Sequence, residues 1–153
     1  MPKHKKLTRL SGFDYSAPRS YFVTMCVLGR QKIFGKPKAA GIALEEVIAH
    51  RNAGWYWLHT YAIMPDHVHL LIKLNNTCRS LGRVVGVLKS AILHKVRRSG
   101  EDFQWQESFY DHILREGEDS GKIADYILAN PERAGLVASG ESYPFCGMVD
   151  RRW

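Results

Sequence analysis

The chain has 153 residues and a formal net charge of +7 at pH 7, with an isoelectric point near 9.5. That length suits a single domain with a full hydrophobic core, which we place at residues 1–153 with a basic arm at 1–20 and a C-terminal tail at 131–153. The excess of basic residues favours a polyanionic partner, most simply nucleic acid.

The sequence argues against two other classes of protein. No apolar run approaches the roughly 18 residues of a membrane-spanning helix, so we expect no membrane partner. Cys26, Cys78 and Cys146 are widely spaced and include no C-x-x-C pair. This spacing argues against both a disulfide framework and a zinc knuckle. We therefore expect a soluble protein of the reducing cytoplasm.

The first two predicted elements are a strand and a helix. Residues 21–28 (YFVTMCVL) form a β-branched and aromatic run that is typical of a buried strand. Pro37 then begins a helical stretch, and Gly54 is placed as its C-terminal cap. The helix is indicated by residues that recur at spacings of three and four, namely Ala40, Leu44, Val47, Ile48 and Arg51.

A hairpin and a second helix follow. Residues 55–63 are aromatic-rich and strand-like, residues 64–66 (MPD) supply turn chemistry, and residues 67–73 return as the next strand. The second helix is predicted to begin after Ser80 as its N-cap and to end before Gly100. Its apolar face comprises Leu81, Val84, Val85, Leu88 and Ile92.

A short fourth strand at residues 103–106 (FQWQ) would complete the order β-α-β-β-α-β, which is the split unit of ferredoxin-like folds and is shared by RRM-like domains. We therefore predict an α+β fold, in which an antiparallel sheet forms a palm and an additional C-terminal helix follows it. There is no internal repeat and no linker, so one domain suffices.

The last predicted helix carries a tyrosine and an asparagine four residues apart. Ser120 can cap this helix, and Pro131 is predicted to end it, because proline disfavours helical geometry in the residue before it. Tyr126 and Asn130 project together from the flank of its apolar stripe. Without further context, a tyrosine packed at the helix edge and an asparagine suited to its pre-proline position explain the pair better than a function does. The stripe consists of Ile123, Ile127 and Leu128.

Two histidines lie one apolar residue apart in the strand predicted at 67–73. Because alternate strand residues share a face, His67 and His69 point the same way, with Cα atoms about 6.6 Å apart. Two imidazoles at that separation can bind one cation at about 2.1 Å each. By itself the pair fits a metal site and two half-exposed strand histidines equally well. The residues that alternate with them and would face the core are Val68, Leu70 and Ile72.

Three ordered blocks of sequence together resemble one family. They are PDHVHLL at residues 65–71, WQESFYDHILR at 105–115 and DYILANPERAGLV at 125–137, with FVT at 22–24 and Arg30 ahead of them. These blocks resemble the HUH single-tyrosine transposases, and specifically the branch of REP-associated tyrosine transposases. The likeness spans nearly the whole chain, and three ordered blocks are far more specific than a single His-x-His.

The resemblance implies an HUH endonuclease fold that acts on single-stranded DNA with a divalent cation, Mg²⁺ or Mn²⁺. By position, it implies that His67 and His69 are metal ligands and that Tyr126 is the nucleophile. Asn130 falls where related transposases place a further metal ligand, often glutamine. The branch also implies a hairpin substrate of the repetitive extragenic palindrome type and a monomer, whereas other single-tyrosine insertion-sequence transposases are homodimers with shared sites.

The implied chemistry suits these residue types. A phosphodiester is an anion, so a cation at the two histidines would reduce its repulsion of an incoming tyrosinate. The phenol of Tyr126 must lose its proton during the attack, to a base or water that the sequence does not identify. The resulting 5′-phosphotyrosine bond keeps the energy of the phosphodiester, so a free 3′ hydroxyl can rejoin the DNA without ATP.

Two alternatives remain open at this point. A non-catalytic RRM-like module would explain the charge and the element order, although no RNP-type aromatic run is present. A phosphodiesterase that uses a metal-bound water would leave Tyr126 a structural residue. Single strands also offer unstacked bases that can stack on aromatic side chains. The candidates are Tyr56, Trp57, Tyr110 and Trp153, although most of them are better explained as core.

Basic side chains are expected to follow the DNA backbone, without assigned contacts. The candidates are Lys3, Lys5, Lys6, Arg9, Arg83, Lys89, Arg115 and Arg133.

Overall fold

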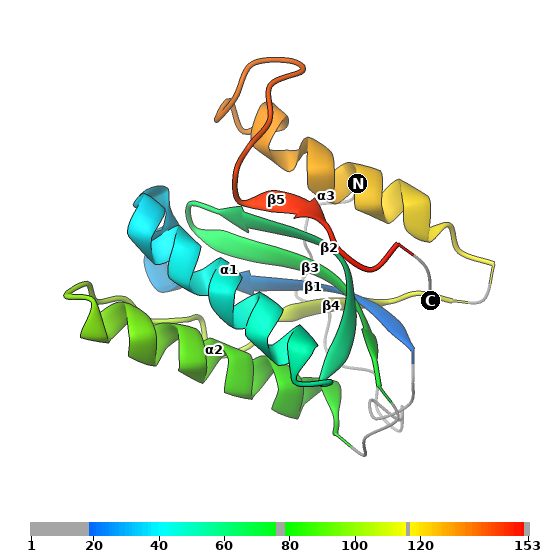
Figure 1. The fold of residues 1–153 in the computed structure, drawn as a ribbon, viewed down its shortest axis with the longest axis horizontal. Coiled ribbons are helices and arrows are strands. Elements are labelled where there is room, and N and C mark those ends of the chain that lie inside the picture. The colour runs from blue at the N-terminus through cyan, green and yellow to red at the C-terminus, as the bar shows by residue number, and fades with distance from the viewer. Residues whose placement is uncertain (1–18, 76–78, 116, 152–153) are drawn as a thin grey trace.

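The computed structural model describes residues 19–75, 79–115 and 117–151 (Figure 1). The described part contains five strands, three α-helices and two short 3-10 helices. In chain order they are β1 (Ser20–Cys26), η1 (Leu28–Arg30), η2 (Ile33–Gly35), α1 (Pro37–Asn52), β2 (Tyr56–Met64), β3 (His67–Leu74), α2 (Leu81–Arg98), β4 (Tyr110–Ile113), α3 (Ser120–Arg133) and β5 (Cys146–Met148).

The strands form one sheet in the order β4-β1-β3-β2-β5, and every neighbouring pair is antiparallel. The first four strands and two helices follow the order β-α-β-β-α-β, so the predicted α+β palm is confirmed. α3 and β5 are added after this unit. β3 of the β2–β3 hairpin lies between β1 and β2 in the sheet (Figure 1). The register pairs His67 with Cys26 and His69 with Thr24 of β1.

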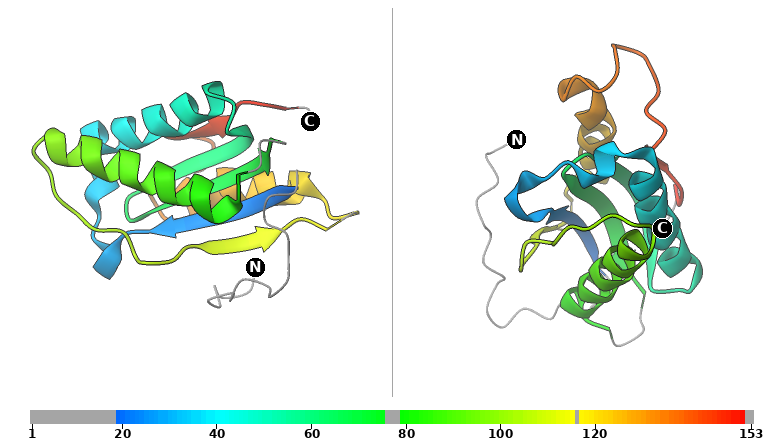
Figure 2. Two further views of the ribbon diagram at one scale, coloured as in Figure 1. Left: turned by 90° about the horizontal axis from the view of Figure 1, so that it is seen from below. Right: turned by 90° about the vertical axis from the view of Figure 1, so that its left-hand side faces the viewer.

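Helices cover both faces of the sheet (Figure 2). On one face α1 and α2 pack over a core that includes Val68, Leu70 and Ile72. On the other face α3 packs over a smaller cluster that includes Phe22, Leu71 and Ile127. Because strand residues alternate between faces, the histidines of β3 lie on the α3 face, opposite the larger core, as the alternation predicted.

The predicted ends of the first two helices are confirmed. Ser80 caps α2 by accepting a hydrogen bond from the backbone N–H of Arg83 at 3.2 Å. Gly54 lies just after α1 with a φ of +82°, and Gly100 lies just after α2 with a φ of +99°. These are left-handed backbone conformations that favour glycine at the end of a helix. Each helix in the described part of the chain is too short or too polar to span a lipid bilayer.

The prediction of the fourth strand was wrong. Residues 103–106 form one isolated bridge, between Trp105 and Val27, while the fourth strand is Tyr110–Ile113, which pairs with β1. The aromatic character of residues 103–106 serves the core instead, since the rings of Phe103 and Trp105 lie 5.5 and 5.6 Å from that of Phe34. A short aromatic run is compatible with either use, and periodicity alone does not separate them.

The predicted ends of the last helix were also wrong. The N-cap is Asp119, whose carboxylate accepts from the backbone N–H of Gly121 at 2.8 Å, and Ser120 is the first helical residue. Pro131 lies inside α3, which continues to Arg133. Proline removes one backbone donor, but the last turn still closes because the N–H of Ala134 donates to the carbonyl of Asn130 at 2.9 Å.

Part of the segment predicted as a tail completes the sheet. β5 pairs with β2. Just beyond it, Asp150 is buried, with 9% of its surface exposed. The Asp150 carboxylate accepts hydrogen bonds from Nε of Arg51 at 3.1 Å and from the backbone N–H of Leu58 at 2.8 Å. The end of the described chain is therefore attached to α1 and β2.

The substitution Asp150→Asn is expected to lower the free energy of unfolding at neutral pH by about 1–2 kcal/mol, because it removes a charge-assisted contact from a buried site. The hydrogen bond from Arg51 lowers the pKa of Asp150 in the folded state, with a further contribution from the N–H of Leu58. A lowered folded-state pKa stabilises the protein above the unfolded-state pKa of about 3.9, and this stabilisation is lost as the pH falls through the folded-state value.

Urea unfolding of wild type and variant checks this prediction. The difference in stability should be full at neutral pH and should shrink in acid, whereas a difference that does not change with pH would contradict it. Glu45→Gln, at an exposed carboxylate on α1, is the matched control and should leave stability nearly unchanged.

Candidate active site

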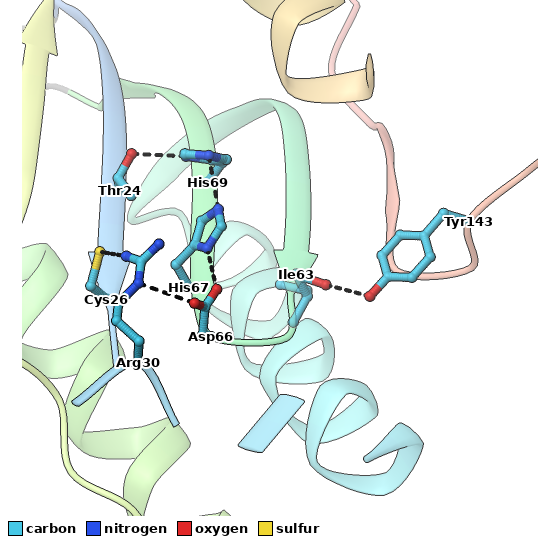
Figure 3. A network of polar contacts seen from close by, with 8 residues as sticks. All are labelled: Thr24, Cys26, Arg30, Ile63, Asp66, His67, His69 and Tyr143. Carbon is cyan, nitrogen blue, oxygen red and sulfur yellow. Dashed lines mark hydrogen bonds and ion pairs between the residues drawn. The ribbon is translucent and has the colours of Figure 1, made fainter. Parts of the chain in front are cut away.

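The two histidines of β3 are directed at each other. The Nε2 atoms of His67 and His69 lie 3.1 Å apart, and their rings meet edge to face (Figure 3). The His67 side chain is 15% exposed, whereas His69 is 1% exposed. The pair therefore forms a site that is closed on the His69 side and is reached from solvent on the His67 side.

Each ring is fixed through its other nitrogen. Nδ1 of His67 lies 2.7 Å from Oδ1 of Asp66, and Nδ1 of His69 lies 2.8 Å from Oγ1 of Thr24. Thr24 is the direct partner of His69 in the register of β1 and β3. Since a carboxylate accepts hydrogen bonds, Nδ1 of His67 is the donor to Asp66, and Nε2 is the nitrogen directed at His69.

This arrangement fits a divalent cation. Two nitrogens that lie 3.1 Å apart can both bind one ion at about 2.1 Å. A hydrogen bond at Nδ1 is the usual way in which proteins orient a histidine that binds metal through Nε2. Among the described residues, no group of three or more His, Cys, Asp or Glu side chains could hold a metal. An ion at this pair would need further ligands, and amide, water or phosphate oxygens could supply them.

α3 brings Tyr126 to the histidines. The ring of Tyr126 lies 6.3 Å from the ring of His69 and 6.0 Å from that of Phe22. Ile123 and Ile127, on the apolar stripe of α3, are buried in the cluster beneath the helix and fix its position on the sheet. Two side chains that lie 57 positions apart in the sequence thus share one site.

Asn130 lies one turn further along α3. Its Nδ2 donates to the carbonyl of Tyr126 at 3.2 Å, so the amide is hydrogen-bonded to the backbone of its own helix. The next turn carries Arg133, whose guanidinium lies 4.0 Å from the centre of the Tyr126 ring and also donates to the Tyr126 carbonyl at 2.9 Å. Arg133 therefore adds a positive charge beside the phenol. The role of Asn130 as a ligand stays a prediction.

The family model described as "Transposase IS200 like" matches residues 19–130, which include both histidines, Tyr126 and Asn130. The chain belongs to this family. The predicted resemblance to single-tyrosine insertion-sequence transposases is thereby confirmed at the level of the family.

Individual relatives of this IS200-like transposase share about a quarter of its residues or fewer. An uncharacterised protein of Haemophilus influenzae is 23% identical over 84% of this chain and 88% of its own length. A REP-associated tyrosine transposase of Escherichia coli K12 is 25% identical over 58% of this chain. The aligned region covers 52% of that relative, so this chain spans about half of its length.

A solved structure supports the fold. The structure of a REP-associated tyrosine transposase bound to a REP hairpin matches 92% of this chain and 82% of that one, with a TM-score of 0.74 and 18% identity. At that identity the match establishes the shared fold. The α+β palm is therefore a fold shared with a REP-associated tyrosine transposase, the branch that the motifs resembled.

The predicted basic track of this IS200-like transposase divides between two faces. Lys3, Lys5, Lys6 and Arg9 lie outside the described residues. Arg83 and Lys89 belong to α2, on the face of the sheet opposite the histidines. Lys89 donates to the carbonyl of Gln106 at 2.7 Å and so holds the 103–108 segment against α2. Arg115 is exposed after β4, and Arg133 lies at Tyr126.

The candidate aromatic platforms divide in a similar way. Tyr56 is buried and donates to the carbonyl of Val47 at 2.7 Å, so it belongs to the core. Trp57 is 46% exposed and Tyr110 is half-buried, so these two remain accessible. Trp153 lies outside the described residues.

Sequence reasoning missed the residues that orient the histidines. Thr24 and Asp66 were noted as parts of motifs, but neither was given a contact with the site. The position of Asp66 directly before His67 was the available signal, since a neighbouring carboxylate often orients a metal-binding imidazole. For Thr24 no local signal exists, because its contact with His69 depends on the register of β1 against β3.

Proposed function

We propose that this IS200-like transposase cleaves single-stranded DNA with Tyr126 and rejoins it, with a divalent cation held by His67 and His69. The observation that carries this proposal is the juxtaposition of three side chains. The paired Nε2 atoms offer a site for a cation, and the ring of Tyr126 lies 6.3 Å from that of His69.

The proposed cleavage transfers a phosphoryl group to the protein. Oη of Tyr126 forms a bond to phosphorus, the bond from phosphorus to the 3′ oxygen breaks, and the phenolic proton is lost as the leaving oxygen gains one. The product is a 5′-phosphotyrosine and a free 3′ hydroxyl. Attack by a 3′ hydroxyl on the phosphotyrosine reverses these steps and restores Tyr126.

A cation bound here would polarise the oxygens of the phosphodiester whose phosphorus Tyr126 attacks. A ligand set of imidazoles completed by oxygen donors accepts Mn²⁺ readily and Mg²⁺ with more retained water. Arg133 supports the same reaction, because its charge lies beside the Tyr126 ring, where an anionic phosphodiester has to approach.

The proposed substrate is a DNA hairpin with a single-stranded flank. Three observations support it: the REP hairpin bound by the structural relative, the name of the Escherichia coli relative, and the net charge of +7 on this chain. We further propose that one chain completes its own active site and acts as a monomer. This is supported by the contact between α3 and the histidine face within a single chain.

The decisive experiment looks for a covalent bond between protein and DNA. The protein is incubated with Mn²⁺ and a pool of labelled hairpin oligonucleotides with single-stranded flanks, and the mixture is run on a denaturing gel. We expect a protein band shifted by attached DNA, and a chelator should abolish it. Cleavage without attachment would favour a phosphodiesterase that uses a metal-bound water. Binding without cleavage would favour a non-catalytic module.

A further inference from the structure

The carboxylate of Asp66 has two partners, one on each oxygen. Oδ1 lies 2.7 Å from Nδ1 of His67, and Oδ2 lies 3.0 Å from Nε of Arg30 (Figure 3). The guanidinium of Arg30 also donates from Nη1 to Sγ of Cys26 at 3.1 Å. A continuous chain of polar contacts therefore runs from the end of β1 through the hairpin turn to the histidine pair.

The backbone of Arg30 is in a costly conformation. Its φ of +57° makes it the single non-glycine residue with a positive φ in the described part of the chain, and it follows Gly29 at +68°. A left-handed conformation strains a residue that has a Cβ, because the Cβ lies too close to the following carbonyl oxygen. Such strain persists where the surrounding contacts hold the residue in place, and it often accompanies function.

The loop that carries Arg30 is attached to the β2–β3 turn by its backbone. The N–H of Val27 donates to the carbonyl of Asp66 at 2.9 Å, and the N–H of Phe34 donates to that of Pro65 at 2.9 Å. These two bonds flank Arg30 in sequence and hold its loop beside the turn. The strained backbone therefore delivers the guanidinium to the Asp66 carboxylate.

We propose that Arg30 is a positioning residue for His67: it holds one oxygen of Asp66 so that the other fixes the imidazole with Nε2 facing His69. This inference rests on the proposed metal-dependent function. The Asp66 side chain is 20% exposed, so without a second partner its carboxylate can rotate and bind water. Two partners on two oxygens fix the plane of the carboxylate, and thereby the ring of His67.

A direct contact between Arg30 and DNA is the competing explanation, because the side chain is 55% exposed. The two explanations differ in the absence of DNA. A positioning residue affects the histidine in the free protein, whereas a phosphate contact affects DNA affinity and its salt dependence. The test therefore begins without DNA or metal.

The first readout is the tautomer of His67 in the metal-free protein, from long-range ¹H–¹⁵N NMR at a pH where the imidazole is neutral. Wild type should show a single Nδ1–H form, and Arg30→Met should show a mixture of both forms. Arg30→Gly removes the same guanidinium and relieves the backbone strain, so it replaces Arg30→Met if that variant does not fold. Lys32→Met, which removes an exposed charge from the same loop, should match wild type.

The second readout is Mn²⁺ affinity, measured by calorimetry in a double-mutant cycle. We expect Arg30→Met to weaken binding about five- to ten-fold, at the low end of the effects of outer-shell partners. In the Asp66→Asn background the same substitution should change affinity less than two-fold, because Arg30 acts through Asp66.

The outcomes separate this inference from the proposed function. An unchanged His67 tautomer in both Arg30 variants overturns the inference, and so does an equal loss of Mn²⁺ affinity with and without Asp66. If wild type binds no Mn²⁺ but the tautomer still depends on Arg30, the positioning role stands and the proposed metal site fails.

Discussion

Tyr126→Phe is expected to abolish DNA cleavage, with a loss of at least about a thousand-fold, and to remove the covalent adduct. The substitution deletes one oxygen and keeps the ring. The contacts of that ring with Phe22 and His69, and the Arg133 guanidinium above it, are therefore retained. Because DNA affinity depends mainly on phosphate contacts, binding at a fixed salt concentration should stay within a few-fold of wild type.

Single-turnover cleavage and equilibrium binding on the same labelled hairpin measure the two effects. The matched control is Tyr61→Phe, which removes a hydroxyl from a half-buried tyrosine of β2 and should leave cleavage unchanged. Cleavage that persists in Tyr126→Phe would exclude this tyrosine as the nucleophile and would favour attack by a metal-bound water.

His67→Ala is expected to reduce metal-dependent cleavage about a hundred-fold or more, because one of the two proposed imidazole ligands is lost. Its effect on DNA binding should be within a few-fold. His67 is a cleaner target than His69. The His67 side chain is partly exposed at the hairpin turn, whereas His69 is 1% exposed and bonded to Thr24. Truncation of His69 therefore also opens a buried site beneath α3.

Cleavage rates over a series of Mn²⁺ concentrations, together with calorimetric Mn²⁺ affinity, check this prediction. His94→Ala is the control, since His94 is exposed on α2, on the opposite side of the sheet. A His67→Ala protein that is folded, binds Mn²⁺ as wild type does and still cleaves would remove this histidine from the metal site.

Much of the fold could be predicted from sequence, because its signals are local. The alternation at Val68, Leu70 and Ile72 set both the strand and the face of the sheet that holds the core. Helix caps such as Ser80 and Gly54 are equally local, since each satisfies backbone groups within a few residues of itself. These predictions were confirmed.

The errors lie where non-local contacts compete with local pattern. Residues 103–106 were predicted as a strand, but the rings of Phe103 and Trp105 pack against Phe34 from another part of the chain. β1 pairs with Tyr110–Ile113 instead. The helix continued past the predicted stop at Pro131 because the following turn still closes its hydrogen bonds. β5 was not predicted, since it is three residues long and exists through its pairing with β2.

The same division holds for the candidate site. Local pattern was enough to show that His67 and His69 share a face, because the pleat of a strand repeats every two residues. The ordered motifs, through their resemblance to a family, indicated Tyr126 as the nucleophile. Tertiary structure alone placed Tyr126 beside His69, set Thr24 opposite His69 and brought Arg30 to Asp66. Those contacts join segments far apart in the chain, so they depend on how α3, β1 and the hairpin pack together, and no local pattern encodes that packing.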